Sequence, residues 1–183
     1  SFIGVSLGAW VACRLALDHP ELVDKLTLVA ASGMRANTET MGQIKGARTK
    51  AVEDPSWENV KPIFSNLMFD EKDRIDDLVA LRQACYRQPE MKLAMQHILC
   101  LQEPEIRARN LIPVEQWCDI RAPTLVFAAP QDRVDFYETA RKAAVLIPGA
   151  RLVEIPNVKH WAQFERPELF NKLNLEFLGS GLS

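Results

Sequence analysis

Long apolar runs are missing from this sequence: Lys, Arg, Asp or Glu interrupts each stretch before the roughly 20 apolar residues that a transmembrane helix needs. We therefore expect no membrane partner. The four cysteines lie far apart, without a CxxC pair or the Cys/His spacing of a zinc site. This pattern predicts no metal and a reduced, cytoplasmic protein. The formal net charge is only −2 and no basic stripe stands out, so we expect no nucleic-acid partner.

What is present is an alternation of strand-like and helix-like segments at both ends of the chain. The predicted strands are short, apolar and rich in Val, Leu and Ile, as expected of parallel strands buried on both faces; they cover residues 1–5, 25–32, 124–129 and 150–155. The predicted helices cover residues 7–19, 135–146 and 167–178. Strands that alternate with helices predict an α/β fold with a mostly parallel sheet.

The middle of the chain differs in character. It is more charged, its apolar residues recur at helical spacing, and prolines interrupt it at positions 55, 62, 89 and 104. We interpret it as four or so helices inserted between two strands of one sheet. The chain then divides into a core segment 1–32, a helical lid 33–118 and a second core segment 119–183.

One motif lies in the right context for a nucleophile. Residues 4–8 read Gly-Val-Ser-Leu-Gly, the G-x-S-x-G pattern, between a predicted strand and a predicted helix. Small residues on both sides of Ser6 would let the strand and the helix pass close together. The backbone N–H of Leu7, at the helix start, would then face a developing oxyanion. We predict Ser6 as nucleophile and Leu7 as one oxyanion donor; the alternative is a glycine-flanked turn with an incidental serine.

A nucleophilic serine needs a base and an orienting carboxylate. Among three histidines, His160 follows a strand and so lies at the sheet edge that carries Ser6, whereas His19 precedes a proline and His97 lies in the helical middle. Asp132 follows the strand 124–129; its rival Asp135 is placed to cap the next helix. We predict a triad of Ser6, Asp132 and His160, in the chain order expected for this chemistry.

These residues resemble the α/β-hydrolase superfamily across the whole chain, and most of all the meta-cleavage product hydrolases, which break a carbon–carbon bond in ring-fission products of aromatic degradation. Residues 160–165 (His-Trp-Ala-Gln-Phe-Glu) and the later Phe-Asn pair are similar to runs of that family, as is Gln-Asp-Arg at 131–133. Residues 81–89 resemble its lid helix and following turn. The resemblance implies that Arg82 binds the carboxylate or dienolate end of the substrate and that Trp161 lines the pocket.

The sequence departs from that family at several positions. An Asn usual before the serine is Val5, Gly-Gly is Gly8 and Ala9, and a Pro after the acid is Phe136. The strands and the second oxyanion donor that the family places before the nucleophile have no counterpart. We therefore expect the C-terminal part of a longer α/β-hydrolase, with N-terminal strands missing and the activity that of the full-length parent.

The resemblance implies a serine hydrolase that cleaves a carbon–carbon bond in a small-molecule substrate, without metal or organic cofactor, and that can form a homo-oligomer. A carboxylesterase or other acyl hydrolase of the same fold is the first alternative. A non-catalytic ligand-binding protein of this fold is the second. Haloperoxidase-like activity also uses a serine, whereas haloalkane dehalogenation needs a carboxylate at position 6 and is disfavoured.

Overall fold

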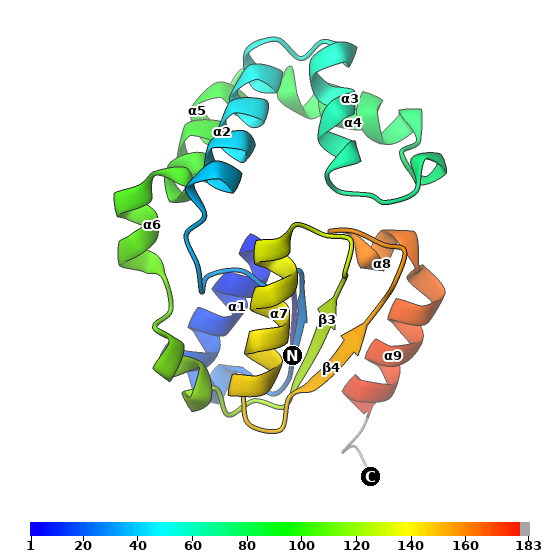
Figure 1. Cartoon of the computed structure of the whole chain (residues 1–183). Coiled ribbons are helices and arrows are strands. Elements are labelled where there is room, and N and C mark those ends of the chain that lie inside the picture. The colour runs from blue at the N-terminus through cyan, green and yellow to red at the C-terminus, as the bar shows by residue number, and fades with distance from the viewer. Residues whose placement is uncertain (180–183) are drawn as a thin grey trace. The chain divides into compact units, whose positions relative to one another are not determined.

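The computed structural model describes residues 1–179, which form two compact units (Figure 1). The first unit consists of residues 1–35 together with the described residues from 112 onward, and the second of residues 36–111. Each unit is described by itself. Within residues 1–179, no helix combines the length and the apolar character needed to cross a membrane.

A four-stranded parallel sheet forms the centre of the first unit. Its strands are β1 (Phe2–Val5), β2 (Leu26–Val29), β3 (Thr124–Ala128) and β4 (Arg151–Glu154), in the spatial order β1-β2-β3-β4. All residues of β2 and β3 are buried, because these central strands are covered on both faces. The parallel sheet predicted from the sequence is confirmed.

Helices cover the two faces of this sheet. On one face, Phe170 of α9 (Pro167–Gly179) packs on Phe127 of β3 with ring centroids 4.8 Å apart, in a cluster that also holds Val29 and Ile155. A buried hydrogen bond of 2.8 Å from Thr27 to Asn174 adds a polar link to this apolar contact. On the other face lie α1 (Leu7–Asp18), against β1 and β2, and α7 (Val134–Leu146), against β3 and β4 (Figure 1). The remaining short elements of this unit are η1 (Pro20–Leu22), η4 (Val114–Asp119) and α8 (Ala162–Glu165).

Residues 36–111 are entirely helical apart from their turns. The elements are α2 (Thr38–Glu53), α3 (Trp57–Ser65), η2 (Glu71–Asp73), α4 (Asp76–Tyr86), α5 (Met91–Ile98), η3 (Leu99–Gln102) and α6 (Pro104–Asn110). Pro104 occupies the first turn of α6, where a missing N–H costs nothing. Pro62, in contrast, lies inside α3, so our expectation that it interrupts a helix is wrong. The apolar contacts of Val60, Ile63 and Phe64, all buried, stabilise α3 despite the lost hydrogen bond.

The turn from β1 into α1 depends on Gly4. A Cβ on Gly4 would lie 2.5 Å from the carbonyl oxygen of Gly8 and 2.6 Å from the backbone nitrogen of Ala9. At Gly8, by contrast, an added Cβ would meet no atom of the described residues within 4 Å, apart from its chain neighbours and the backbone of its own helix. The prediction that both flanking positions must be small therefore holds for Gly4 and is wrong for Gly8.

We expect Gly4→Ala to lower the free energy of unfolding by about 1–3 kcal/mol, because strand and helix backbones would have to move apart. Gly8→Ala is the matched control and should change it by no more than about 0.5 kcal/mol. Urea unfolding of the purified full-length protein measures both. Equal effects of the two substitutions would contradict the close approach at Gly4.

The four cysteines are free thiols in different surroundings, and this difference can be tested chemically. Cys13 on α1 is fully buried, and burial raises the pKa of its thiol to about 12, whereas Cys85 and Cys118 are exposed. The thiolate is the reactive form, so a raised pKa together with burial lowers the alkylation rate. We expect iodoacetamide to label Cys85 and Cys118 in the native protein at mildly alkaline pH and Cys13 only after unfolding. Mass spectrometry of tryptic peptides reads this out; native labelling of Cys13 at a comparable rate would contradict it.

Candidate active site

Three of the predicted site residues leave the sheet at the same edge. Ser6 directly follows β1, Asp132 lies in the turn after β3, and His160 lies in the loop after β4. Because all four strands are parallel, their carboxyl ends share this edge. Asp132 and His160 thus follow the neighbouring strands β3 and β4. Ser6 follows β1, which β2 separates from β3.

Ser6 has an uncommon backbone conformation, with φ of 55° and ψ of −113°. A positive φ is rare for a residue with a side chain and costs about 1–3 kcal/mol, so the neighbouring structure must enforce it. The Ser6 N–H donates to the carbonyl oxygen of Val29 at 2.9 Å, and the Ser32 hydroxyl donates to the carbonyl oxygen of Ser6 at 2.8 Å. Both partners belong to β2 and its continuation, which therefore fix the turn that carries the serine.

Leu7 is the first residue of α1, and the amides of a first helical turn have no acceptor inside the helix. The Leu7 N–H is the first backbone amide after the Ser6 side chain. The helix start also carries a partial positive charge, which favours an anion there. This placement suits the predicted oxyanion donor.

Asp132 and His160 form a direct pair. The Nδ1 atom of His160 lies 2.8 Å from Oδ2 of Asp132, with only 3% of the Asp132 side chain and 10% of the His160 side chain exposed. The other oxygen, Oδ1, accepts the Arg133 N–H at 2.8 Å. An ionised carboxylate only accepts, so Nδ1 carries the proton and Nε2 is left as an acceptor. The carboxylate that meets His160 is that of Asp132, whereas Asp135 lies in the first turn of α7. Within the described residues, no hydrogen bond joins the Ser6 hydroxyl to His160.

The loop that carries His160 is anchored on both sides. Glu165, which is buried, accepts the Lys159 N–H at 2.7 Å, next to the histidine. The Gln131 side chain, next to Asp132, accepts the N–H of Asn157 at 3.0 Å, and Arg166 donates to the Asn157 carbonyl oxygen at 3.1 Å. Asn157 itself has a φ of 57°. The Gln131–Asn157 bond holds the loop against the turn after β3, and the other two bonds hold the loop against the segment that follows His160.

Aromatic rings complete the surroundings of His160. The buried ring of Phe136 lies 4.5 Å from the imidazole, centroid to centroid, in an edge-to-face arrangement. This is the position at which the resembled family has a proline. Trp161 follows the histidine, is half-buried, and lies 6.3 Å from the ring of Phe164.

Arg82 lies in the helical unit, within a basic cluster that the sequence did not predict. Its guanidinium stacks on the Phe64 ring at 4.9 Å and donates to the Tyr86 hydroxyl at 3.3 Å. Arg48 of α2 donates to the same hydroxyl at 3.0 Å. Burial lowers the pKa of the Arg48 guanidinium; Tyr86 opposes this change, and the charge of Arg82 lowers the pKa further.

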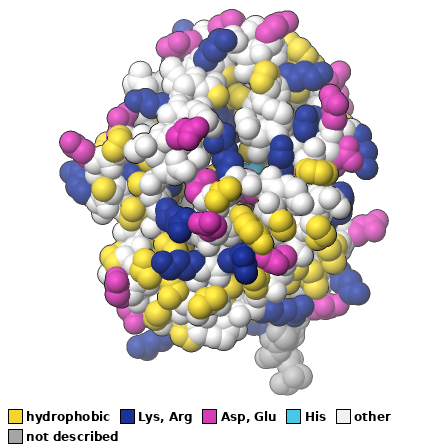
Figure 2. Space-filling model, viewed as in Figure 1, with side chains coloured by type: hydrophobic (Ala, Val, Ile, Leu, Met, Phe, Trp, Pro, Cys, Tyr) yellow, Lys and Arg dark blue, Asp and Glu magenta, His cyan; other side chains and the backbone are white. Residues whose placement is uncertain are grey.

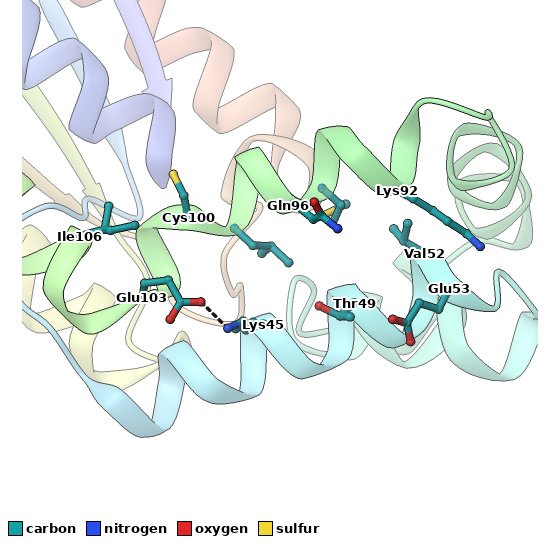
Figure 3. A pocket seen from close by; sticks show the side chains of 11 residues that line it. Lys45, Thr49, Val52, Glu53, Lys92, Gln96, Cys100, Glu103 and Ile106 are labelled. Atoms are coloured by element: carbon teal, nitrogen blue, oxygen red, sulfur yellow. Dashed lines mark hydrogen bonds and ion pairs between the residues drawn. The ribbon is translucent and has the colours of Figure 1, made fainter.

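A separate cavity of about 450 Å³ lies in the helical unit, between α2 on one side and α5, η3 and α6 on the other (Figure 3). Its lining includes the apolar side chains of Val52, Met95 and Leu99, together with Lys45 and Glu103, which form an ion pair. No predicted site residue lines it.

In the described part of the chain, no group of three or more His, Cys, Asp or Glu side chains is arranged to hold a metal ion. Figure 2 shows acidic and basic side chains interspersed on the face in view.

Several supporting residues were missed by sequence reasoning. Ser32, Gln131, Glu165 and Arg48 act through contacts with residues 26 or more positions away or through backbone atoms, which no local pattern reveals. Glu165 and Gln131 had a signal, since they belong to the runs 160–165 and 131–133 that carry the family resemblance. Phe136 stood out only as a departure from that family.

Comparison with known proteins identifies relatives of the chain. Two curated relatives, each 31% identical over 182 residues, are a 2-hydroxy-6-oxo-6-phenylhexa-2,4-dienoate hydrolase from Burkholderia cepacia and a 2-hydroxy-6-oxononadienedioate/2-hydroxy-6-oxononatrienedioate hydrolase from Comamonas testosteroni. The matches cover 98% of this chain but 62% of each relative, so the chain spans less than two thirds of their length.

Among solved structures, the meta-cleavage product hydrolase CumD from Pseudomonas fluorescens IP01, complexed with acetates, is similar with a TM-score of 0.83 and 26% identity. That match covers 96% of this chain and 63% of CumD. The expected resemblance to meta-cleavage product hydrolases is thus confirmed. The family model of the alpha/beta hydrolase fold matches residues 2–167, and the chain belongs to that family.

Proposed function

We propose that the full-length protein is a serine hydrolase that cleaves a carbon–carbon bond beside a carbonyl group in a ring-fission product of aromatic degradation. The observation that carries the proposal is the buried Asp132–His160 pair, at the sheet edge where Ser6 has a strained backbone. Relatives named for dienoate substrates support the bond type. A small-molecule substrate is the partner that this chemistry requires, and the free cysteines suit a reducing compartment such as the cytoplasm.

In the proposed mechanism, the base is one nitrogen of His160 and the nucleophile is the hydroxyl oxygen of Ser6. The Nε2 atom of His160 takes the proton of the Ser6 hydroxyl, while Asp132 holds the Nδ1–H and stabilises the imidazolium. The Ser6 oxygen then attacks the substrate carbonyl, and the Leu7 N–H donates to the resulting oxyanion. His160 returns the proton to the leaving carbon as the carbon–carbon bond breaks. Water, activated by the same histidine, releases the acid from Ser6.

Carbon–carbon cleavage needs one step that ester cleavage does not. The substrate dienol must first become a ketone by losing its hydroxyl proton and taking up a proton at carbon, so that the departing carbon can carry the electron pair of the broken bond. A cation at the carboxylate or dienolate end favours this step, and Arg82 is the residue that we assign to it. Trp161, beside His160, is assigned to the wall of the pocket.

We expect Ser6→Ala, His160→Ala and Asp132→Asn each to lower kcat/KM for a 2-hydroxy-6-oxo-dienoate by about a thousandfold or more. The loss of the yellow dienolate absorbance measures the rate. Asp135→Asn, three residues from the acid, is the matched control and should retain wild-type activity. If Asp135→Asn were as damaging as Asp132→Asn, the acid assignment would be overturned.

The role of Arg82 is tested by comparing two substrates. We expect Arg82→Met to slow bleaching of the dienoate about tenfold or more, because a charge-assisted contact is lost, and to leave an uncharged nitrophenyl ester nearly unaffected. Equal losses on both substrates would show a structural role.

The wild-type protein distinguishes the alternative functions. Ester cleavage without dienoate bleaching would favour the esterase alternative. An absence of turnover on both substrates, together with no fluorophosphonate labelling of Ser6, would favour the ligand-binding protein.

A further inference from the structure

Two guanidinium groups in the helical unit converge on one phenol oxygen. Arg48 from α2 and Arg82 from α4 both donate to the Tyr86 hydroxyl, at 3.0 and 3.3 Å. A phenol oxygen has two acceptor positions, and these two bonds use both of them. The arrangement brings two like charges to one atom, which is unfavourable unless negative charge is supplied nearby.

The same geometry leaves hydrogen-bond donors without use. Tyr86 is 7% exposed, yet among the described residues no acceptor receives its hydroxyl proton. Arg48 is half-buried, and within residues 1–179 its only polar partner is the Tyr86 oxygen, with no carboxylate paired to it. A buried donor without an acceptor costs about 1–3 kcal/mol, so the buried Tyr86 hydroxyl is a group that an acceptor from a ligand would stabilise.

The stacking of Arg82 on Phe64 indicates that the cluster is a fixed structure. The guanidinium lies 4.9 Å from the Phe64 centroid and 5.9 Å from the Tyr86 centroid, so two rings orient it. Phe64 and Tyr86 are themselves buried. The Arg82 guanidinium is therefore held against the Tyr86 side chain without a ligand, and Arg48 joins them through its hydrogen bond to the Tyr86 hydroxyl.

We propose that Arg48 and Tyr86 complete, with Arg82, a site for a carboxylate group, so that Arg48 supplies a second cation and Tyr86 a neutral O–H donor. A carboxylate has two oxygens with about four acceptor positions, which match two guanidinium forks and one hydroxyl. This inference rests on the proposed function for the identity of the anion, which is the carboxylate of the dienoate substrate. It adds Arg48 and Tyr86 as residues that select acidic substrates over uncharged ones.

The test measures binding apart from turnover. In the Ser6→Ala protein, a titration with the 2-hydroxy-6-oxo-dienoate followed by its absorbance gives Kd. We expect Arg48→Met to weaken Kd by about ten- to a hundredfold, as for a charged hydrogen bond, and Tyr86→Phe to weaken it severalfold. Lys50→Met, which removes an exposed positive charge from the same helix, is the matched control and should leave Kd unchanged.

Steady-state kinetics of the variants with Ser6 intact distinguish a loss of substrate recognition from a loss of protein stability. Arg48→Met should raise KM for the dienoate with little change in its kcat, and should leave kcat/KM for an uncharged nitrophenyl ester at the wild-type value. Arg48→Lys keeps the charge without the fork, so it should restore part of the affinity. If Arg48→Met unfolds the helices, Arg48→Lys and Tyr86→Phe still decide the question.

The outcomes distinguish this inference from the proposed function. An unchanged Kd in both Arg48→Met and Tyr86→Phe, or equal losses on the charged and uncharged substrates, would overturn the carboxylate site while leaving the triad standing. A Ser6→Ala protein that still bleaches the dienoate would overturn the proposed function, and the titration would then be repeated with benzoate as a simple carboxylate probe. Weaker benzoate binding by Arg48→Met than by Lys50→Met would still support the site.

Discussion

The parallel pairing of the four strands is the constraint on which the site depends. One row of paired residues, Val5, Val29, Phe127 and Val153, crosses the whole sheet and packs on the Phe170 cluster. This row sets the level at which each strand ends, and therefore the level at which the loops bearing Ser6, Asp132 and His160 begin. Val29 and Phe127 are buried and Val5 and Val153 are partly buried, so a shift of one strand by a single residue would remove its apolar side chain from this contact with the Phe170 cluster. The relative depth of Ser6, Asp132 and His160 is thus a consequence of core packing.

The loops above this row are held by hydrogen bonds to backbone atoms of neighbouring loops. Val29 and Ser32 fix the strained backbone of Ser6, and Gln131 and Glu165 fix the loop before His160. Each bond joins a segment that carries a proposed catalytic residue to a neighbouring segment of the same edge. A positive φ at Ser6 and at Asn157 persists because these partners leave few alternatives. Preorganisation of this kind keeps donors and acceptors in place before a substrate arrives.

The alternation of apolar strands and amphipathic helices was enough to predict the parallel sheet and its order of elements, because each buried strand is a local run such as residues 124–128. The motif at residues 4–8 in its strand-to-helix context, with the chain order of Ser6, Asp132 and His160, was enough to propose the triad. Only the structure shows that the carboxylate in contact with His160 is that of Asp132, because its rival Asp135 lies only three residues away in the sequence. Gly8 was misjudged because a sequence pattern does not show which glycine is approached by backbone. Pro62 was misjudged because the buried face of α3 outweighs its local preference. The division of the chain into core and lid segments stays a prediction.

The two units differ in how their charged side chains are paired. The sheet unit holds Asp132 and His160 as a direct hydrogen-bonded pair that forms without a ligand. The helical unit instead gathers two guanidinium groups around Tyr86, where like charges and an unused hydroxyl proton raise the free energy of the ligand-free state. An anion removes that cost only when it binds there, which makes the cluster selective for acidic molecules without requiring it to move. The chemistry proposed for the sheet edge and the anion binding proposed for the helices can then change separately, because a substitution at Arg48 or Arg82 need not disturb the row of residues beneath Ser6, Asp132 and His160.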